Sequence, residues 1–254
     1  MNGQPDDRFR QCRASGLITS VKAALLRLSD RLYDGGAAKF GTLPAPLIAA
    51  TLVTGVVDAV SYLALGHIFV ANMTGNVVFL GFALAGAKGL TVWAPILAIA
   101  CFAAGALAET RLARFMTRPG SRASGDDRHR LARAVSVHAA FVAVALLIAA
   151  LEDDGKTATH AQLTAILAFG FGVQNAVVRR LGIPDLTTTV LTMTVTGLAA
   201  DPLGKPTVRR LLSLVCIFLG AVAGGLSVVH SGVSTALAIA LALLLITVVL
   251  TRVE

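Results

Sequence analysis

Eight apolar runs of 15 to 22 residues make up most of this chain, and they carry few charged side chains. A run of about 20 apolar residues is long enough for a helix that crosses the hydrocarbon core of a bilayer. Only 14% of the 254 residues are charged, whereas a soluble domain has about 25%. The sequence therefore predicts an all-α, polytopic membrane protein. The runs are 45–66, 68–87, 90–110, 134–151, 161–178, 186–200, 209–229 and 233–250.

A pattern of small and polar residues occurs twice, in the same order. The first copy includes Gly-Val-Val-Asp-Ala-Val, and the second has Gly-Val-Gln-Asn-Ala-Val in its place. The matching segments are 55–60 with 172–177, 74–77 with 192–195, and 101–106 with 216–221, separated by 115 to 118 residues. We interpret the two copies as one duplicated unit, with repeat one at 45–151 and repeat two at 161–250.

The positions of the 22 Lys and Arg residues determine the expected topology. Twenty of them lie in four regions: the first 44 residues, residues 111–133, residues 179–210, and Arg252. Because basic residues gather in cytoplasmic loops, an even number of crossings must separate neighbouring basic regions. Eight crossings break this rule.

The rule is satisfied if 68–87 and 186–200 enter the membrane and return, or are broken, instead of crossing it. We therefore predict six full transmembrane helices plus two re-entrant or broken helices, arranged as two inverted repeats with the N-terminus in the cytoplasm. A seven-crossing alternative, in which 68–87 spans, would put the basic N-terminal tail on the outer face.

The first 44 residues are expected to form a cytoplasmic tail, ahead of a membrane domain at 45–254. Apolar residues from Ile18 to Leu32 recur every three or four positions, with Lys22, Arg27 and Arg31 on the other side. This spacing predicts an amphipathic helix on an anionic membrane surface. The alternative is a disordered tail.

Residues 55–81, which contain Asp58 and the segment Asn72-Met73-Thr74-Gly75-Asn76, resemble the YoaK family of bacterial multi-pass membrane proteins. Residues 172–176 and the threonine-rich stretch 187–196 look like the second signature of that family. The resemblance covers about residues 45–230. It implies a protein of the bacterial inner membrane, and it brings no established activity.

Polar residues at membrane depth are the candidates for a central site. Asp58 lies about twelve residues into its run, where a charge costs at least about 2.5–3.5 kcal/mol to insert. Inverted symmetry would bring it towards Asn175, beside Gln174, and transporters bind solutes at such interfaces next to broken helices. The full set of candidate substrate- or ion-binding residues is Asp58, Asn72, Thr74, Asn76, Gln174, Asn175, Thr192 and Thr194.

Each candidate also has a structural interpretation. Asp58 could be protonated or hydrogen-bonded to a neighbouring helix, and Gln174 and Asn175 could make interhelical hydrogen bonds worth about 0.6 kcal/mol each. Asn72, Thr74 and Asn76, together with the two later threonines, could cap broken helices. The sequence leaves these alternatives open.

Two classes of function follow from the residues. The favoured one is a transporter or channel for a small polar or ionic solute, proton-coupled through Asp58. The alternative is a non-transporting membrane scaffold or sensor with a structural polar core. We expect no enzyme activity, because catalytic sequence motifs are missing, and no cofactor, metal or nucleic-acid partner. The bilayer is the expected partner, and whether the protein forms a homo-oligomer is left open.

Overall fold

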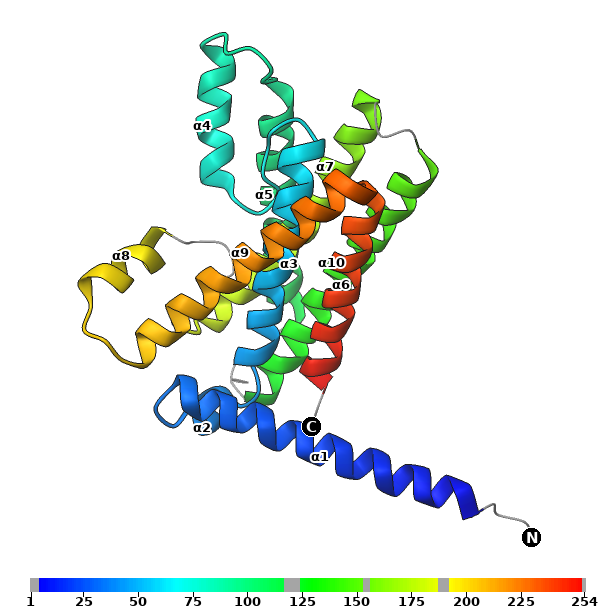
Figure 1. The fold of residues 1–254 in the computed structure, drawn as a ribbon, viewed down its shortest axis with the longest axis vertical. Helices are drawn as coiled ribbons and strands as arrows, with labels where there is room; N and C mark the ends of the chain where they lie inside the picture. The colour runs from blue at the N-terminus through cyan, green and yellow to red at the C-terminus, as the bar shows by residue number, and fades with distance from the viewer. Residues whose placement is uncertain (1–4, 117–123, 153–155, 187–191, 253–254) are drawn as a thin grey trace.

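The computed structural model describes residues 5–116, 124–152, 156–186 and 192–252. Within these ranges every regular element is an α-helix, and Figure 1 shows their arrangement. The helices are α1 (Pro5–Leu32), α2 (Gly36–Phe40), α3 (Pro44–Ala64), α4 (Met73–Leu84), α5 (Trp93–Met116), α6 (Ser124–Leu151), α7 (Thr157–Leu181), α8 (Thr192–Ala200), α9 (Lys205–Ser231) and α10 (Val233–Arg252).

Six helices in the described ranges are long and apolar enough to cross a membrane: α3, α5, α6, α7, α9 and α10. This number agrees with the predicted six full transmembrane helices. In contrast, α4 has 12 residues and α8 has 9. A helix of 12 residues rises only about 18 Å, less than the hydrocarbon core of about 30 Å. Residues 187–191, in the predicted run 186–200, lie outside the described residues.

Local sequence explains where the central helices begin and end. Pro44 starts α3, where the missing N–H of proline costs no hydrogen bond. After α3, both Gly66 and His67 have positive φ angles, of 99° and 58°, which turn the chain back. Gly182 ends α7 with a φ of 60°, in the left-handed conformation that commonly closes helices.

The centre of the bundle is formed by α3 and α7. In these helices 56% and 61% of the most apolar stretch is buried, against 22–39% in the other four spans. α3 packs against α9 and α10, α7 packs against α5 and α6, and α10 also contacts α6 (Figure 1). Each central helix therefore packs against two long helices from the other half of the chain.

Backbone contact joins α3 to α9. A Cβ atom added to Gly55 would overlap the carbonyl oxygen of Ile217, and one added to Gly220 would overlap the carbonyl oxygen of Leu52. Small residues let transmembrane helices approach this closely. Both positions therefore require glycine.

The pair formed by α5 and α7 is joined in the same way. A Cβ atom added to Gly172 would overlap the carbonyl oxygen of Phe102, and one added to Gly105 would overlap that of Phe169. In the repeat alignment Gly172 corresponds to Gly55. Glycines at matching positions of the two predicted repeats thus make similar interhelical contacts.

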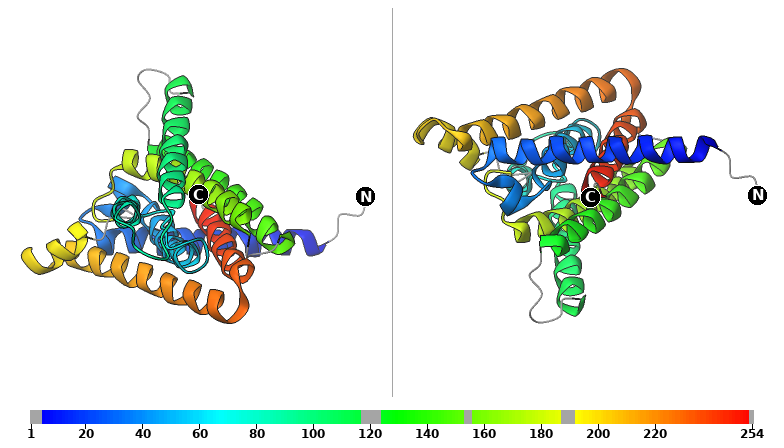
Figure 2. Two further views of the ribbon diagram at one scale, coloured as in Figure 1. Left: turned by 90° about the horizontal axis from the view of Figure 1, so that it is seen from above. Right: turned by 90° about the horizontal axis from the view of Figure 1, so that it is seen from below.

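The basic segments of the sequence meet at one end of the bundle. Arg209, near the start of α9, donates to the carbonyl oxygen of Leu32 at the end of α1 (2.8 Å). Arg128, near the start of α6, donates to the carbonyl oxygen of Thr251 at the end of α10 (3.2 Å). Seen from below, α1 runs across this end beside the end of α10 (Figure 2). Whether α1 lies on a membrane surface stays a prediction.

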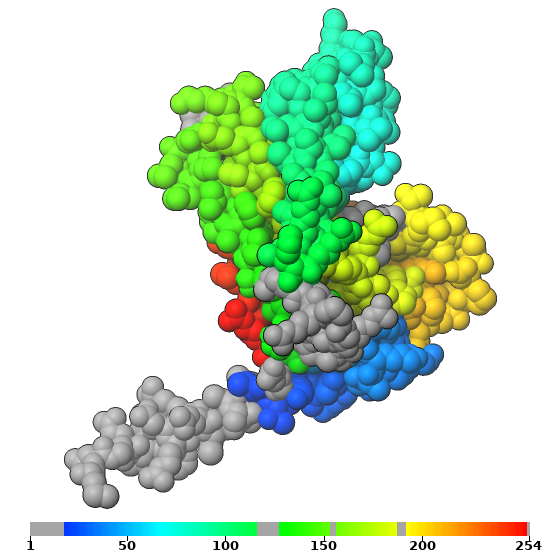
Figure 3. All heavy atoms as spheres, turned by 180° about the vertical axis from the view of Figure 1, so that it is seen from behind, coloured from blue at the N-terminus to red at the C-terminus, as the bar shows by residue number. Residues whose placement is uncertain are grey.

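The two short helices stand at different levels on one side of the bundle. Seen from behind, α4 lies at the end away from α1, and α8 lies nearer to the end that α1 crosses (Figure 3). α4 contacts α5, and α8 contacts α9. These contacts join corresponding elements of the two predicted repeats.

Candidate functional site

A cavity of about 670 Å³ lies where α3, α5 and α9 meet the starts of the two short helices. Four of the predicted site residues line it: Asp58, Asn72, Thr74 and Thr192. Thr74 and Thr192 correspond to each other in the sequence repeat and come from the starts of α4 and α8. Corresponding residues of the two halves therefore meet at one cavity, which we call the Asp58 cavity.

Asp58 projects from α3 near the level where the chain returns after the helix. Its Oδ1 atom accepts a hydrogen bond from the backbone N–H of Ala71 (3.2 Å). Asp58 lies six residues before the end of α3 at Ala64, a rise of about 9 Å. The segment 65–72 thus folds back along α3 to reach the carboxylate, and α4 begins beside it.

Asn76 holds this returning segment in place. Its Oδ1 atom accepts a hydrogen bond from the backbone N–H of Phe69 (2.8 Å), and its Nδ2 atom donates a hydrogen bond to the carbonyl oxygen of the same residue. The side chain is fully buried, and it does not line the Asp58 cavity. The amide bonds both backbone groups of Phe69, so Asn76 fixes the loop rather than contacting a solute in the cavity.

Aromatic rings form one wall of the cavity. The rings of Phe69 and Phe79 stack with centroids 5.7 Å apart, and the ring of Tyr62 lies against both, 5.5 Å from Phe69 and 6.0 Å from Phe79. Phe102 lines the cavity from α5. Gly75 makes room for this wall, because a Cβ atom there would lie 2.7 Å from the ring of Phe69.

The remaining predicted site residues, Gln174, Asn175 and Thr194, do not line the Asp58 cavity. Gln174 is fully buried, and its Oε1 atom lies 2.7 Å from Nδ1 of His138 on α6. Asn175 donates to the carbonyl oxygen of Phe171 within α7 (3.0 Å). Thr194 is buried in α8. The structure therefore divides the predicted site between a cavity and positions within or between helices.

His138 belongs to the polar core but was not among the sequence candidates. It is fully buried, and its ring meets that of Phe171 edge-on at 4.4 Å. The sequence offered one signal, a histidine inside an apolar run. Its partner Gln174 lies 36 residues away, so the pair could not be identified from local spacing.

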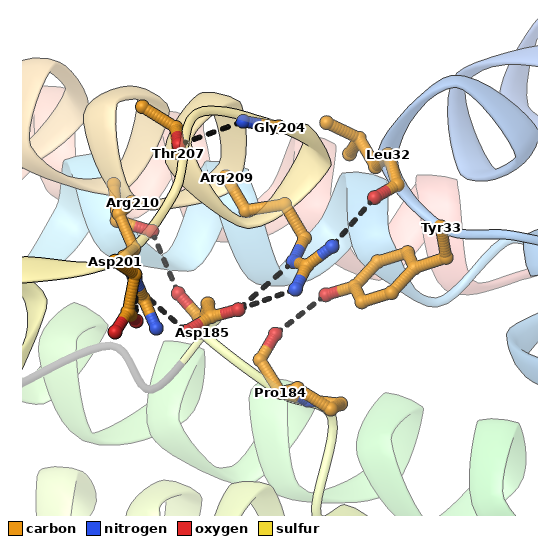
Figure 4. A network of polar contacts seen from close by, with 10 residues as sticks. Leu32, Tyr33, Pro184, Asp185, Asp201, Gly204, Thr207, Arg209 and Arg210 are labelled. Carbon is orange, nitrogen blue, oxygen red and sulfur yellow. Dashed lines mark hydrogen bonds and ion pairs between the residues drawn. The ribbon is translucent and has the colours of Figure 1, made fainter. Parts of the chain in front are cut away.

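An ionic cluster joins the start of α9 to the loop after α7 (Figure 4). Arg209 donates from Nε and Nη2 to Oδ2 of Asp185, and Arg210 donates from Nε to Oδ1 of the same carboxylate (2.9 Å). Arg210 also bonds Asp201, which follows α8 (2.6 Å). The Asp185 carboxylate thus pairs with both arginines, Asp201 supplies the second negative charge, and the cluster holds together the two ends of the segment that carries α8.

The same cluster reaches the N-terminal region. The guanidinium of Arg209 lies 4.4 Å from the centre of the Tyr33 ring, and the Tyr33 hydroxyl donates to the carbonyl oxygen of Pro184 (2.7 Å). Burial raises the pKa of Tyr33, so the hydroxyl stays protonated as a donor. At the surface, Lys205 pairs with Asp34 (2.8 Å) and holds the pKa of that carboxyl below its usual range.

Within the described residues, no group of three or more His, Cys, Asp or Glu side chains is arranged to hold a metal ion. Glu109, a buried carboxylate on α5, forms an ion pair with Arg180 on α7 (3.7 Å). Asp58, the carboxylate that lines the cavity, is therefore separate from Glu109 and from the other ionic groups at the helix ends.

Comparison with known proteins places this architecture in a family. The family described as "Protein of unknown function (DUF1275)" matches residues 47–250. A relative, the "UPF0700 transmembrane protein YoaK" of Bacillus subtilis (strain 168), is 30% identical over 185 residues, covering 67% of this chain and 77% of that protein. No solved structure matches the chain.

Proposed function

This chain belongs to the DUF1275 family and is an integral multi-pass membrane protein, and we propose that it is a transporter or channel for a small cationic solute. The observation that carries the proposal is the Asp58 cavity. Among the described residues that line it, Asp58 is the only one with an ionisable side chain. Ionisable residues within membrane spans commonly mark solute pathways.

The chemistry of the cavity favours a cation. The Asp58 carboxylate supplies a counter-charge, and Asn72 and Thr74 add polar groups. The faces of aromatic rings such as Phe69 and Phe79 attract cations in a desolvated site. A small ammonium ion or a hydrated metal cation fits this combination, and Asp58 would carry the proton in a coupled cycle.

An alternating pathway through this cavity would follow from the predicted inverted repeats. Gly55 and Gly172 make equivalent backbone contacts in the two halves, and the short helices α4 and α8 stand at different levels of the bundle. We propose that the two segments predicted as re-entrant, 68–87 and 186–200, reach the cavity from opposite sides of the membrane. Such broken elements at a repeat interface are common in secondary transporters.

The charge distribution supports an orientation. Arg128, Arg209 and Arg252 lie at the end of the bundle crossed by α1, and basic residues favour the cytoplasmic face. We propose the bacterial inner membrane as the location, with the N-terminus in the cytoplasm. The α4 end would then face outward.

Flux measurement tests the proposal. The full chain is reconstituted into liposomes, and uptake of K⁺, ammonium and methylammonium is measured with and without a pH gradient. Asp58→Asn should abolish uptake, because the counter-charge and the proton carrier are lost. Glu152→Gln is the matched control, since this exposed carboxylate lies at the end of α6. Uptake by Asp58→Asn equal to that of the parent protein would contradict the proposal.

A second function is favoured by one observation. Asp58 accepts the backbone N–H of Ala71, so the carboxylate also holds the returning segment to α3. A non-transporting scaffold or sensor would need only this structural role. For such a protein, Asp58→Asn would lower thermal stability, and neither the variant nor the parent protein would carry a flux above that of empty liposomes.

A further inference from the structure

A second cavity, of about 540 Å³, lies at the basic end of the bundle between α6 and α10. One side is formed by α6 residues spaced by three and four positions, which share one helical face. The other side is the last turn of α10. The lining residues are Arg128, His129, Ala132, Arg133, Ser136, Thr251 and Arg252. We call this the basic cavity.

The charged side chains among the described residues that line the basic cavity are all positive or, for His129, can become so. Arg128, Arg133 and Arg252 contribute three permanent positive charges, and none of the described lining residues is acidic. Arg128 donates from Nη2 to the carbonyl oxygen of Thr251 (3.2 Å), which satisfies one of the last carbonyl groups of α10. This bond also fixes the arginine at the mouth of the cavity, so its charge stays beside the other two.

We infer that the basic cavity binds a phosphate group carried by a ligand larger than inorganic phosphate. Arginine presents a planar fork that matches phosphate oxygens, and pairs of this kind are among the strongest hydrogen-bonded contacts in proteins. The volume lies in the range of about 300–1,000 Å³ that is common for small organic ligands. The ligand therefore has room for a glycerol or sugar group beside the phosphate.

The position of the cavity suits a phosphate at the membrane surface. It lies at the ends of two spanning helices, and basic pockets between such helices bind anionic lipid headgroups. A soluble phosphate ester offers the same chemistry from the aqueous side. The two sources differ in the acyl chains, and the test separates them on that basis.

Binding to the purified full chain in neutral detergent is the test. The probes are short-chain phosphatidylglycerol, glycerol phosphate and inorganic phosphate, with short-chain phosphatidylcholine as the zwitterionic comparison, and affinity is measured by native mass spectrometry and by the shift of Tm. The variant Arg133→Gln/Arg252→Gln should bind the preferred probe about thirtyfold more weakly, since each basic group near an anionic surface contributes about a fivefold gain. Arg111→Gln/Arg114→Gln removes two exposed arginines outside the cavity and should bind normally.

The probes give distinct outcomes. The inference is supported if the protein prefers phosphatidylglycerol or glycerol phosphate and only the Arg133→Gln/Arg252→Gln variant loses affinity. The preferred probe then shows whether the phosphate comes from a lipid or from a soluble ester. Equal loss in both double variants means diffuse charge attraction and overturns the inference. The inference is also overturned if inorganic phosphate binds as tightly as the larger probes, or if none of the probes binds. Arg133→Lys separates the fork from the charge, because it keeps the charge but loses the fork and should bind with intermediate affinity.

Discussion

His138 and Gln174 are hydrogen-bonded across the α6–α7 interface, with Nδ1 and Oε1 2.7 Å apart and both side chains fully buried. In the repeat alignment Gln174 corresponds to Val57, which is also fully buried. A polar side chain at a core position needs a partner, because an unsatisfied buried group costs about 1–3 kcal/mol. His138 provides that partner for Gln174.

Gln174→Leu should lower the free energy of unfolding by about 1–3 kcal/mol, because it leaves the histidine without its partner. Denaturant unfolding in detergent, followed by circular dichroism, measures the loss. The double variant His138→Leu/Gln174→Leu removes both polar groups and should recover part of it. The pair is not a structural hydrogen bond if the double variant loses more free energy of unfolding than the two single variants lose together.

Gly55→Ala should destabilise the protein by about 1–3 kcal/mol, because the added methyl group overlaps the carbonyl oxygen of Ile217 and forces α3 away from α9. Gly81→Ala is the control: it lies within α4, where an added Cβ would meet nothing within 4 Å. That variant should be neutral or slightly stabilised. Equal thermal stabilities for the two variants would show that α3 and α9 are not in close backbone contact.

Asn76→Leu should release the segment 65–72, because both hydrogen bonds to the backbone of Phe69 are lost. Hydrogen exchange followed by mass spectrometry should show faster exchange in this segment, with a loss of about 1–3 kcal/mol in local stability. Asn72→Leu is the comparison. Asn72 lines the cavity and makes no side-chain cap for α4, so its substitution should leave exchange unchanged and reduce solute uptake.

Arg209→Lys should loosen the N-terminal region while keeping the charge. Lysine lacks the guanidinium fork through which Arg209 donates to Asp185 and to the carbonyl oxygen of Leu32 at the same time. We expect limited proteolysis near the end of α1 to become faster, in line with about 2–3 kcal/mol for the lost charged hydrogen bonds. Arg210→Lys disturbs the same carboxylate but not Leu32, and it should leave the proteolysis rate unchanged.

Thiol labelling tests the proposed orientation. In a background without Cys12, Cys101 and Cys216, Lys88→Cys should react with an impermeant reagent on intact cells, and Arg111→Cys should react only after lysis. Both positions are exposed in the structure. Protection of position 88 in intact cells, with labelling after lysis, would mean that 68–87 crosses the membrane, and the inverted-repeat proposal would fail.

The sequence predicted the elements of this fold better than their partners. Apolar runs and the even-crossing rule predicted the six long spans, because length and charge are local properties, and they left 68–87 and 186–200 as re-entrant or broken segments. Asp58 was recognised because a carboxylate inside an apolar run is conspicuous. Its partner Ala71 carries no such signal, since any residue can donate a backbone N–H.

The contacts that the sequence did not reveal join residues far apart in the chain. Arg209 and Leu32 are 177 residues apart, and Tyr33 and Pro184 are 151 residues apart. A repeat can predict that two residues correspond, but it does not determine which neighbour each one contacts. Gln174 shows this: it was expected to extend the polar site formed by Asp58 and Asn175, and its side chain is bonded to His138 on α6.

The close contact between α3 and α9 also has a consequence for biogenesis. A ribosome completes α3 well before it synthesises Ile217 and Gly220, so α3 must enter the bilayer without the helix that covers Gly55. During that interval Asp58 has one partner already made, the N–H of Ala71, which emerges only 13 residues later. We therefore expect the returning segment to shield the carboxylate from lipid during synthesis, until the second half of the chain arrives.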